Sequence, residues 1–210
     1  MAVVWTEENA SQESLNAWTH GIGFLLSVPA SIWLCWLAAH ESSEKLMACM
    51  VYGLSLCGMY LFSMLSHAIR EPVRRNQVRS IDQGVIYTLI AGTFTPFIAT
   101  YLEGIPCILL MTAVWAAAIA GFYSKIFAKH RIDNMTSVSY VLLGWIPAMV
   151  LFSFVPYACF GMMIVGGVLY TVGTQFLQND HIAWYFHAIW HTLVILASLA
   201  HFVAIVVFCI

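Results

Sequence analysis

Long runs of apolar residues, separated by short polar segments, set the pattern of this 210-residue chain. Each run is about 20 residues long, the length that an α-helix needs to cross the hydrocarbon core of a bilayer. Only helices and closed β-barrels satisfy their backbone groups in lipid, and continuous apolar runs lack the alternation of a barrel strand. We therefore expect an all-α polytopic membrane protein, a bundle of seven transmembrane helices. The predicted spans are at about residues 18–39, 46–66, 84–101, 105–123, 138–154, 158–176 and 183–208.

The composition supports a single membrane domain. Hydrophobic residues make up 61% of the chain and charged residues 9%, whereas a soluble domain carries roughly 25% charged residues. The spans leave only short loops, so we expect residues 1–16 to form a short N-terminal segment and residues 17–210 to form the seven-helix domain. Residues 1–12 contain no Lys or Arg, unlike the start of a cleaved signal peptide. Eight basic residues beside ten acidic ones argue against nucleic-acid binding.

The basic residues predict how the helices are oriented across the membrane. Seven of the eight lie in two loops on one side, after the second and the fourth predicted span. They are Arg70, Arg74, Arg75, Arg79, Lys125, Lys129 and Arg131. The other side carries only Lys45. The positive-inside rule then predicts that the basic loops and the N-terminus are cytoplasmic and that the C-terminus is outside.

Titratable side chains within the spans gather in one leaflet. His67 ends the second span and Asp82 begins the third, while His187 and His191 lie in the part of the seventh span on the same side. His20 belongs to the first turn of the first span. Titratable groups inside a span are costly, so each of these residues is a candidate functional residue.

The spacing of these residues suits a zinc site. His187 and His191 are four residues apart, so both imidazoles project from one face of a helix. With His67 they offer three nitrogen ligands and leave a fourth position to water, the open arrangement of catalytic rather than structural zinc. Asp82 would orient or deprotonate that water. Ser63, one turn before His67, would hydrogen-bond the water or a substrate oxygen.

Simpler roles stay open for the same residues. Two histidines four apart in a span can also hydrogen-bond to neighbouring helices or lie at the level of the lipid headgroups. We expect His20 to support the site or meet the interface, and His201, about 80° from His191 around the helix, to contact a neighbouring helix. Cysteines without a C-x-x-C motif indicate small apolar residues inside helices. Three further histidines are expected in loops: His40, His130 and His181.

Four short motifs occur in order along the chain. They are Glu13-x-x-Asn16-x-x-Thr19-His20-Gly21, Ser63-x-x-x-His67, Asp82 with Tyr87 and the segment 91–97, and His187-Ala188-Ile189-Trp190-His191 with His201. Together they resemble the hemolysin III family, the bacterial branch of the progestin and adipoQ receptors, in a superfamily that includes the alkaline ceramidases. Each motif is short, but their order and their positions on the first, second, third and seventh spans are specific. The resemblance covers nearly the whole chain, from about residue 13 onward.

This resemblance implies a seven-helix protein of the bacterial cytoplasmic (inner) membrane, with its N-terminus inside and a zinc ion held by three histidines. Carried over residue by residue, the implied zinc ligands are His67, His187 and His191, with Asp82 and Ser63 around a bound water and with His20, Glu13 and Asn16 as supporting residues. None of the ligand positions departs from the family's pattern.

Three functions follow as hypotheses. The related receptors and ceramidases are associated with the hydrolysis of lipid amides, so the first is a zinc-dependent hydrolase of a lipid amide or ester, acting on a membrane lipid or lipid-like substrate. The second is a non-enzymatic sensor or regulator of membrane lipid homeostasis, with zinc as a structural clamp. The third is a pore-forming cytolysin, which is disfavoured because no span carries a polar stripe. A one-sided cluster of titratable groups also argues against transport.

Overall fold

The computed structural model describes residues 7–127 and 134–210, and this part of the chain is helical without a strand. It contains seven helices within the described residues. They are α1 (Glu7–Glu41), α2 (Ser43–Ala68), α3 (Pro72–Tyr101), α4 (Gly104–Phe127), α5 (Asn134–Leu151), α6 (Tyr157–Gln178) and α7 (Phe186–Phe208). The all-helical class predicted from the apolar runs is confirmed.

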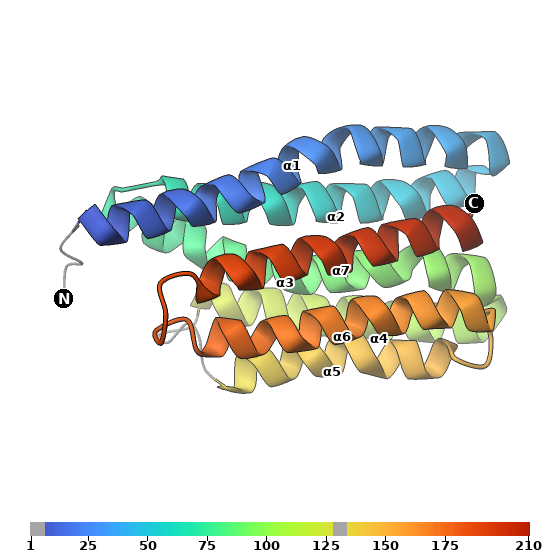
Figure 1. The fold of residues 1–210 in the computed structure, drawn as a ribbon. Helices are drawn as coiled ribbons and strands as arrows, with labels where there is room; N and C mark the ends of the chain where they lie inside the picture. Colours follow the sequence, from blue (N-terminus) through green and yellow to red (C-terminus); the bar gives the residue numbers. More distant parts are fainter. Residues whose placement is uncertain (1–6, 128–133) are drawn as a thin grey trace.

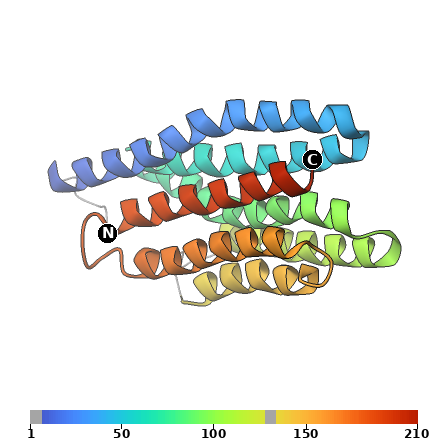
Figure 2. The same ribbon diagram turned by 45° about the vertical axis from the view of Figure 1, so that its right-hand side comes forward.

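The helices run roughly side by side along one axis, and successive helices alternate in direction (Figure 1). Helix α1 packs on α2, α2 on α3, and α6 on α7. The first turns of α7 lie at the same end of the bundle as the first turns of α1, and α7 ends at the opposite end (Figures 1 and 2). The ends of α2 and α6 and the start of α3 therefore meet the starts of α1 and α7.

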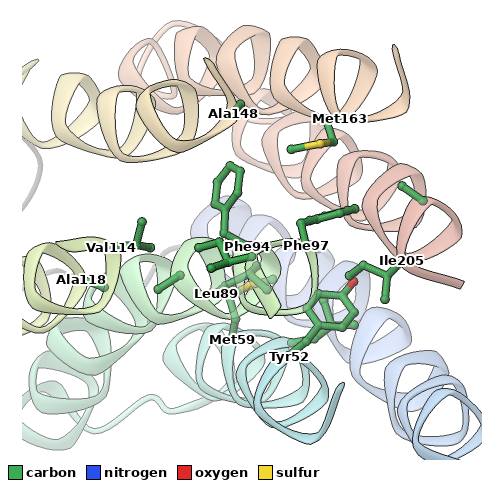
Figure 3. Close-up of a cluster of buried hydrophobic side chains, with 14 of the residues drawn as sticks. Tyr52, Met59, Leu89, Phe94, Phe97, Val114, Ala118, Ala148, Met163 and Ile205 are labelled. Carbon is green, nitrogen blue, oxygen red and sulfur yellow. The ribbon is translucent and has the colours of Figure 1, made fainter. Parts of the chain in front are cut away.

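Helix α3 occupies the middle of the bundle and contacts α2, α4, α5 and α7. Its second half supplies much of the core, including Leu89, Phe94 and Phe97 (Figure 3). Tyr52 from α2 and Ile205 from α7 pack into the same cluster. Helices on the outside of the bundle instead expose large apolar side chains, as expected for surfaces that face lipid tails rather than water.

Membrane character follows from length and hydropathy. Six of the described helices are long and apolar enough to cross a bilayer, namely α1, α2, α3, α4, α6 and α7. Helix α5 is shorter, with an apolar stretch at Ser137–Leu151. The chain is therefore a polytopic helical membrane protein.

The structure corrects the predicted boundary before the third span. Residues 74–79 were expected in a loop, but they form the first turns of α3. Glu71 caps this helix, because its carboxylate accepts hydrogen bonds from the backbone N–H groups of Val73 and Arg74 at 2.9 and 2.7 Å. Pro72 at the first position is compatible with a helix start. The basic residues lengthen the helix beyond its apolar stretch, and a hydropathy pattern alone does not detect such an extension.

Candidate metal centre

Three histidines converge at the end of the bundle where α1 and α7 begin. His67 lies in the last turn of α2, and His187 and His191 lie in the first turns of α7. The ring centroid of His67 is 4.9 Å from that of His187 and 5.1 Å from that of His191. The centroids of His187 and His191 are 4.7 Å apart. One potential ligand atom from each residue lies within 4.8 Å of the other two. The spacing on α7 and the position at the end of α2 thus bring these three residues together.

Each of the three imidazoles has its Nδ1 atom engaged by a partner outside the cluster. Nδ1 of His67 is 2.7 Å from the Glu13 carboxylate, and Nδ1 of His187 is 3.2 Å from the Asp180 carboxylate. Because an ionised carboxylate only accepts hydrogen bonds, Nδ1 carries the proton in both rings. In the neutral ring the other nitrogen, Nε2, keeps its lone pair, which is the form that binds a metal.

In His191, contacts with helix α1 place the proton on Nδ1. Its Nδ1 lies 3.2 Å from the backbone carbonyl of Asn16 and 2.9 Å from the Thr19 hydroxyl oxygen. The Thr19 hydroxyl itself donates to the Asn16 carbonyl at 2.9 Å, so its oxygen is left to accept. Nδ1 of His191 must therefore be the donor, and in the neutral ring Nε2 is again unprotonated.

This donor set fits a divalent cation of the zinc type. Three imidazoles held from two helices, whose Nε2 atoms carry a lone pair in the neutral ring, match the nitrogen ligands and the open fourth position of catalytic zinc sites. Outer hydrogen bonds that fix the tautomer and the ring orientation are typical of histidine ligands in metal sites. Among the described residues, this is the one group of histidine, cysteine or acidic side chains with such a geometry.

Glu13 connects the cluster to the basic start of α3. Its second carboxylate oxygen forms ion pairs with Arg75 and Arg79, the latter at 3.1 Å. Arg75 is buried and also donates to the backbone carbonyl of Ser66 at 3.3 Å. One carboxylate oxygen of Glu13 is thus held by two arginines. The other accepts the hydrogen bond from His67 and orients that ring. These contacts favour the supporting role expected for Glu13, which stays a prediction.

Asp82 and Ser63 line the same cavity as the two α7 histidines. The cavity has a volume of about 120 Å³, and its lining includes Asp82, Ser63, His187 and His191. The Ser66 hydroxyl donates to the Asp82 carboxylate at 2.8 Å, which leaves further acceptor positions on that carboxylate. A carboxylate and a hydroxyl thus share this cavity with two of the three imidazoles, those of His187 and His191.

His20 and Asn16 contact the centre without joining the metal-binding group. The His20 ring stacks on His191 with centroids 3.6 Å apart, and its Nδ1 is 2.7 Å from the Ser63 hydroxyl oxygen. Asn16 contributes its backbone carbonyl, whereas its buried side-chain oxygen has no hydrogen-bond partner among the described residues. His20 positions the imidazole of His191 and the hydroxyl of Ser63.

Sequence reasoning missed four residues that hold the centre in place: Thr19, Asp180, Ser66 and the buried Arg75. Thr19 lies inside the first motif, one position before His20, and that position was the available signal. Asp180 lies between the predicted spans 158–176 and 183–208, and nothing in its spacing from His187 indicates that this segment folds back onto the α7 histidine. Of the histidines expected in loops, His40 is in the last turn of α1 and His181 is exposed between α6 and α7. His130 lies outside the described residues.

Comparison with known proteins identifies relatives over nearly the full chain. A sequence profile described as haemolysin-III related matches residues 8–202. The hemolysin-3 homolog of Bacillus subtilis (strain 168) is 36% identical over 203 residues, which cover 95% of this chain and 95% of that protein. Hemolysin-3 of Bacillus cereus is 37% identical over 188 residues, covering 88% of this chain and 85% of that protein.

A more distant similarity extends to animals. The human monocyte to macrophage differentiation factor is 26% identical over 203 residues, covering 92% of this chain and 83% of that protein. The profile match and the two bacterial relatives agree with the motifs found in the sequence. The chain belongs to the haemolysin-III related family.

Proposed function

We propose that the protein is a zinc-dependent hydrolase that acts on an amide or ester bond of a membrane lipid. The observation that carries this proposal is the shared cavity, in which Asp82 and Ser63 lie next to two of the three histidines. A structural metal site needs its ligands but needs no carboxylate and hydroxyl facing open space beside them. Most of the remaining cavity wall is apolar, with residues such as Leu89, Phe94 and Val194, and such a wall suits an acyl chain.

Each residue of the site would have a distinct role in the hydrolysis. His67, His187 and His191 would hold zinc, which when bound supplies a Lewis acid for a carbonyl group and lowers the pKa of water. Asp82 would accept a proton from the attacking water and deliver it to the leaving group. Ser63 would hydrogen-bond a substrate oxygen. The apolar wall would hold the acyl chain and exclude bulk water.

The position in the membrane belongs to the same proposal. We propose that α5 crosses the bilayer together with the six longer helices, which gives seven spans. The basic residues at the start of α3 and the end of α4 then lie in the cytoplasm with the N-terminus, and the C-terminus lies outside. The metal centre would open near the inner headgroups of a bacterial cytoplasmic membrane.

A second function, a non-catalytic regulator with structural zinc, is favoured by a different observation. The partners of the three histidines come from α1 and from the turn before α7, so a bound ion would tie several helices together. On this hypothesis, removal of one ligand unfolds the protein. On the hydrolase hypothesis, removal of one ligand leaves a folded protein without metal or activity.

The decisive experiment compares Asp82→Asn with the wild type after both have been loaded with zinc. Octadecanamide and the corresponding methyl ester serve as probes, and release of octadecanoic acid is measured. We expect the variant to keep its zinc and to lose turnover by about 100-fold or more. Glu103→Gln is the matched control, because it removes an exposed carboxylate at the other end of the bundle. Unchanged turnover in Asp82→Asn would refute the catalytic role.

A further inference from the structure

A second polar group faces the same cavity at a distance from the metal centre. His201 lies on α7, is buried among apolar helices, and lines the cavity that also contains His187 and His191. It has no part in the metal-binding group. A histidine inside a membrane span is costly, so its presence at a cavity wall calls for a function.

The hydrogen bonding of His201 fixes what its ring can bind. Nδ1 is 2.9 Å from the backbone carbonyl of Ala197 in the preceding turn. A carbonyl only accepts, so Nδ1 carries the proton, and in the neutral ring Nε2 has a free lone pair. Within the part of the chain that the structure describes, Nε2 receives no hydrogen bond. The ring therefore offers an acceptor to a hydroxyl or an N–H group from inside the cavity.

Helix α6 leaves space for the imidazole of His201 at a glycine. A methyl group added at Gly166 of α6 would lie 2.1 Å from Cε1 of His201 and 2.3 Å from its Nδ1. The glycine therefore lets the imidazole lie against the backbone of α6. Tyr170, also on α6, stands beside the ring with centroids 5.8 Å apart, but its hydroxyl is already paired with Ser198. The expected helix contact of His201 is present, and the ring also reaches the cavity.

The two polar groups are separated by an apolar stretch. His201 follows His191 by ten residues, which corresponds to about 15 Å along a helix. Val194 lies between them on the cavity side of α7, and the other cavity walls are largely aliphatic or aromatic. A ligand that contacts both ends must therefore be polar, then apolar for about 15 Å, then polar again.

We propose that His201 is a second anchoring site, which accepts a hydrogen bond from a hydroxyl group carried on the acyl chain of the ligand. This inference rests on the proposed function for the position of the ligand's carbonyl group at the metal centre. The substrate class is then a hydroxylated long-chain lipid amide or ester. The required separation of about 15 Å corresponds to roughly 13 bonds of an extended chain, counted from the carbonyl oxygen to the hydroxyl oxygen, given about 3.5 Å for every three backbone bonds.

Three amides test the proposal on the zinc-loaded wild type: octadecanamide, its derivative hydroxylated on carbon 12, and the isomer hydroxylated on carbon 6, where about half of the required separation is spanned. Competition against a fluorescent long-chain amide gives their relative dissociation constants. One additional hydrogen bond in a buried site predicts about fivefold tighter binding of the carbon-12 compound than of either other amide. Equal binding of all three would overturn the proposal, and it is also the result expected if a water molecule satisfies Nε2.

Variants at His201 assign the preference to its ring. His201→Phe keeps an aromatic ring on Gly166 but lacks Nε2, so it should bind octadecanamide normally and lose the preference for the carbon-12 compound. His201→Gln restores an acceptor and should recover part of the preference. A preference that persists in His201→Phe would contradict the proposal. If this variant does not fold, the three wild-type affinities already decide. Binding preference without hydrolysis of any amide would refute the hydrolase but keep the anchoring site.

Discussion

The two ends of the helical bundle are stabilised in different ways. At the metal end, defined by Glu13, His67 and His191 with their partners, buried polar groups form a connected network. At the opposite end, Phe97 of α3 and Ile205 of α7 are fully buried and pack through apolar contacts. The contrast predicts different responses to substitution. Loss of one partner at the metal end leaves another buried polar group unsatisfied, whereas the opposite end responds to volume and shape.

The largest expected effect is the loss of metal from the metal end. His67→Ala removes one of the three proposed nitrogen ligands and leaves two on a single helix, so purified protein should contain little or no zinc. Metal analysis of the purified protein measures this directly. His40→Ala, which removes an exposed histidine at the opposite end of α1, should keep the wild-type metal content. Full zinc occupancy in His67→Ala would mean that the ion binds elsewhere.

A cavity created by substitution at the opposite end should lower stability but leave the metal content unchanged. Phe97→Ala removes a ring with 0% exposure and should lower the free energy of unfolding by about 3 kcal/mol. Thermal unfolding in detergent measures the loss, and zinc content below the melting temperature should stay at the wild-type level. Phe97→Leu keeps most of the volume and should cost less. If Phe97→Ala releases zinc while the bundle remains folded, the two ends are not independent.

The sequence was sufficient for the part of this contrast that depends on hydropathy and helical spacing. Apolar runs predicted the helices, and the four-residue spacing of His187 and His191 predicted that both rings project from one face. The partners of the rings could not be predicted, because Asp180 and Thr19 approach the histidines through the packing of separate segments. The start of α3 was missed for a related reason, since ion pairs with Glu13 hold polar residues in a helix that has no apolar pattern there.

A smaller effect is expected where the metal end is supported indirectly. Asp180→Asn weakens the hydrogen bond to Nδ1 of His187 and removes the charge that orients this ring. Loss of such an outer partner commonly lowers metal affinity by about 10- to 100-fold. Zinc competition with a chelator of known affinity measures the change. Glu103→Gln, at the opposite end, should leave the affinity unchanged, and an equal loss in both variants would indicate a general charge effect instead.

The smallest effect is expected for Glu71, a charged residue at the metal end that does not contact the three histidines. Glu71 is exposed and caps α3, and the hydrogen bonds from the backbone N–H groups of Arg74 and Val73 lower the pKa of its carboxyl group. The folded state therefore favours the ionised form, so this contribution to stability is present above the pKa of the unfolded chain, about 4.3, and is lost as the pH falls through the lower folded value. Glu71→Gln should thus melt slightly below the wild type at neutral pH, with the difference shrinking in acid. Its zinc affinity should not change, because Glu71 forms no part of the network around the three histidines. A change in affinity would show that the cap of α3 also contributes to zinc binding, in addition to the Glu13 ion pairs.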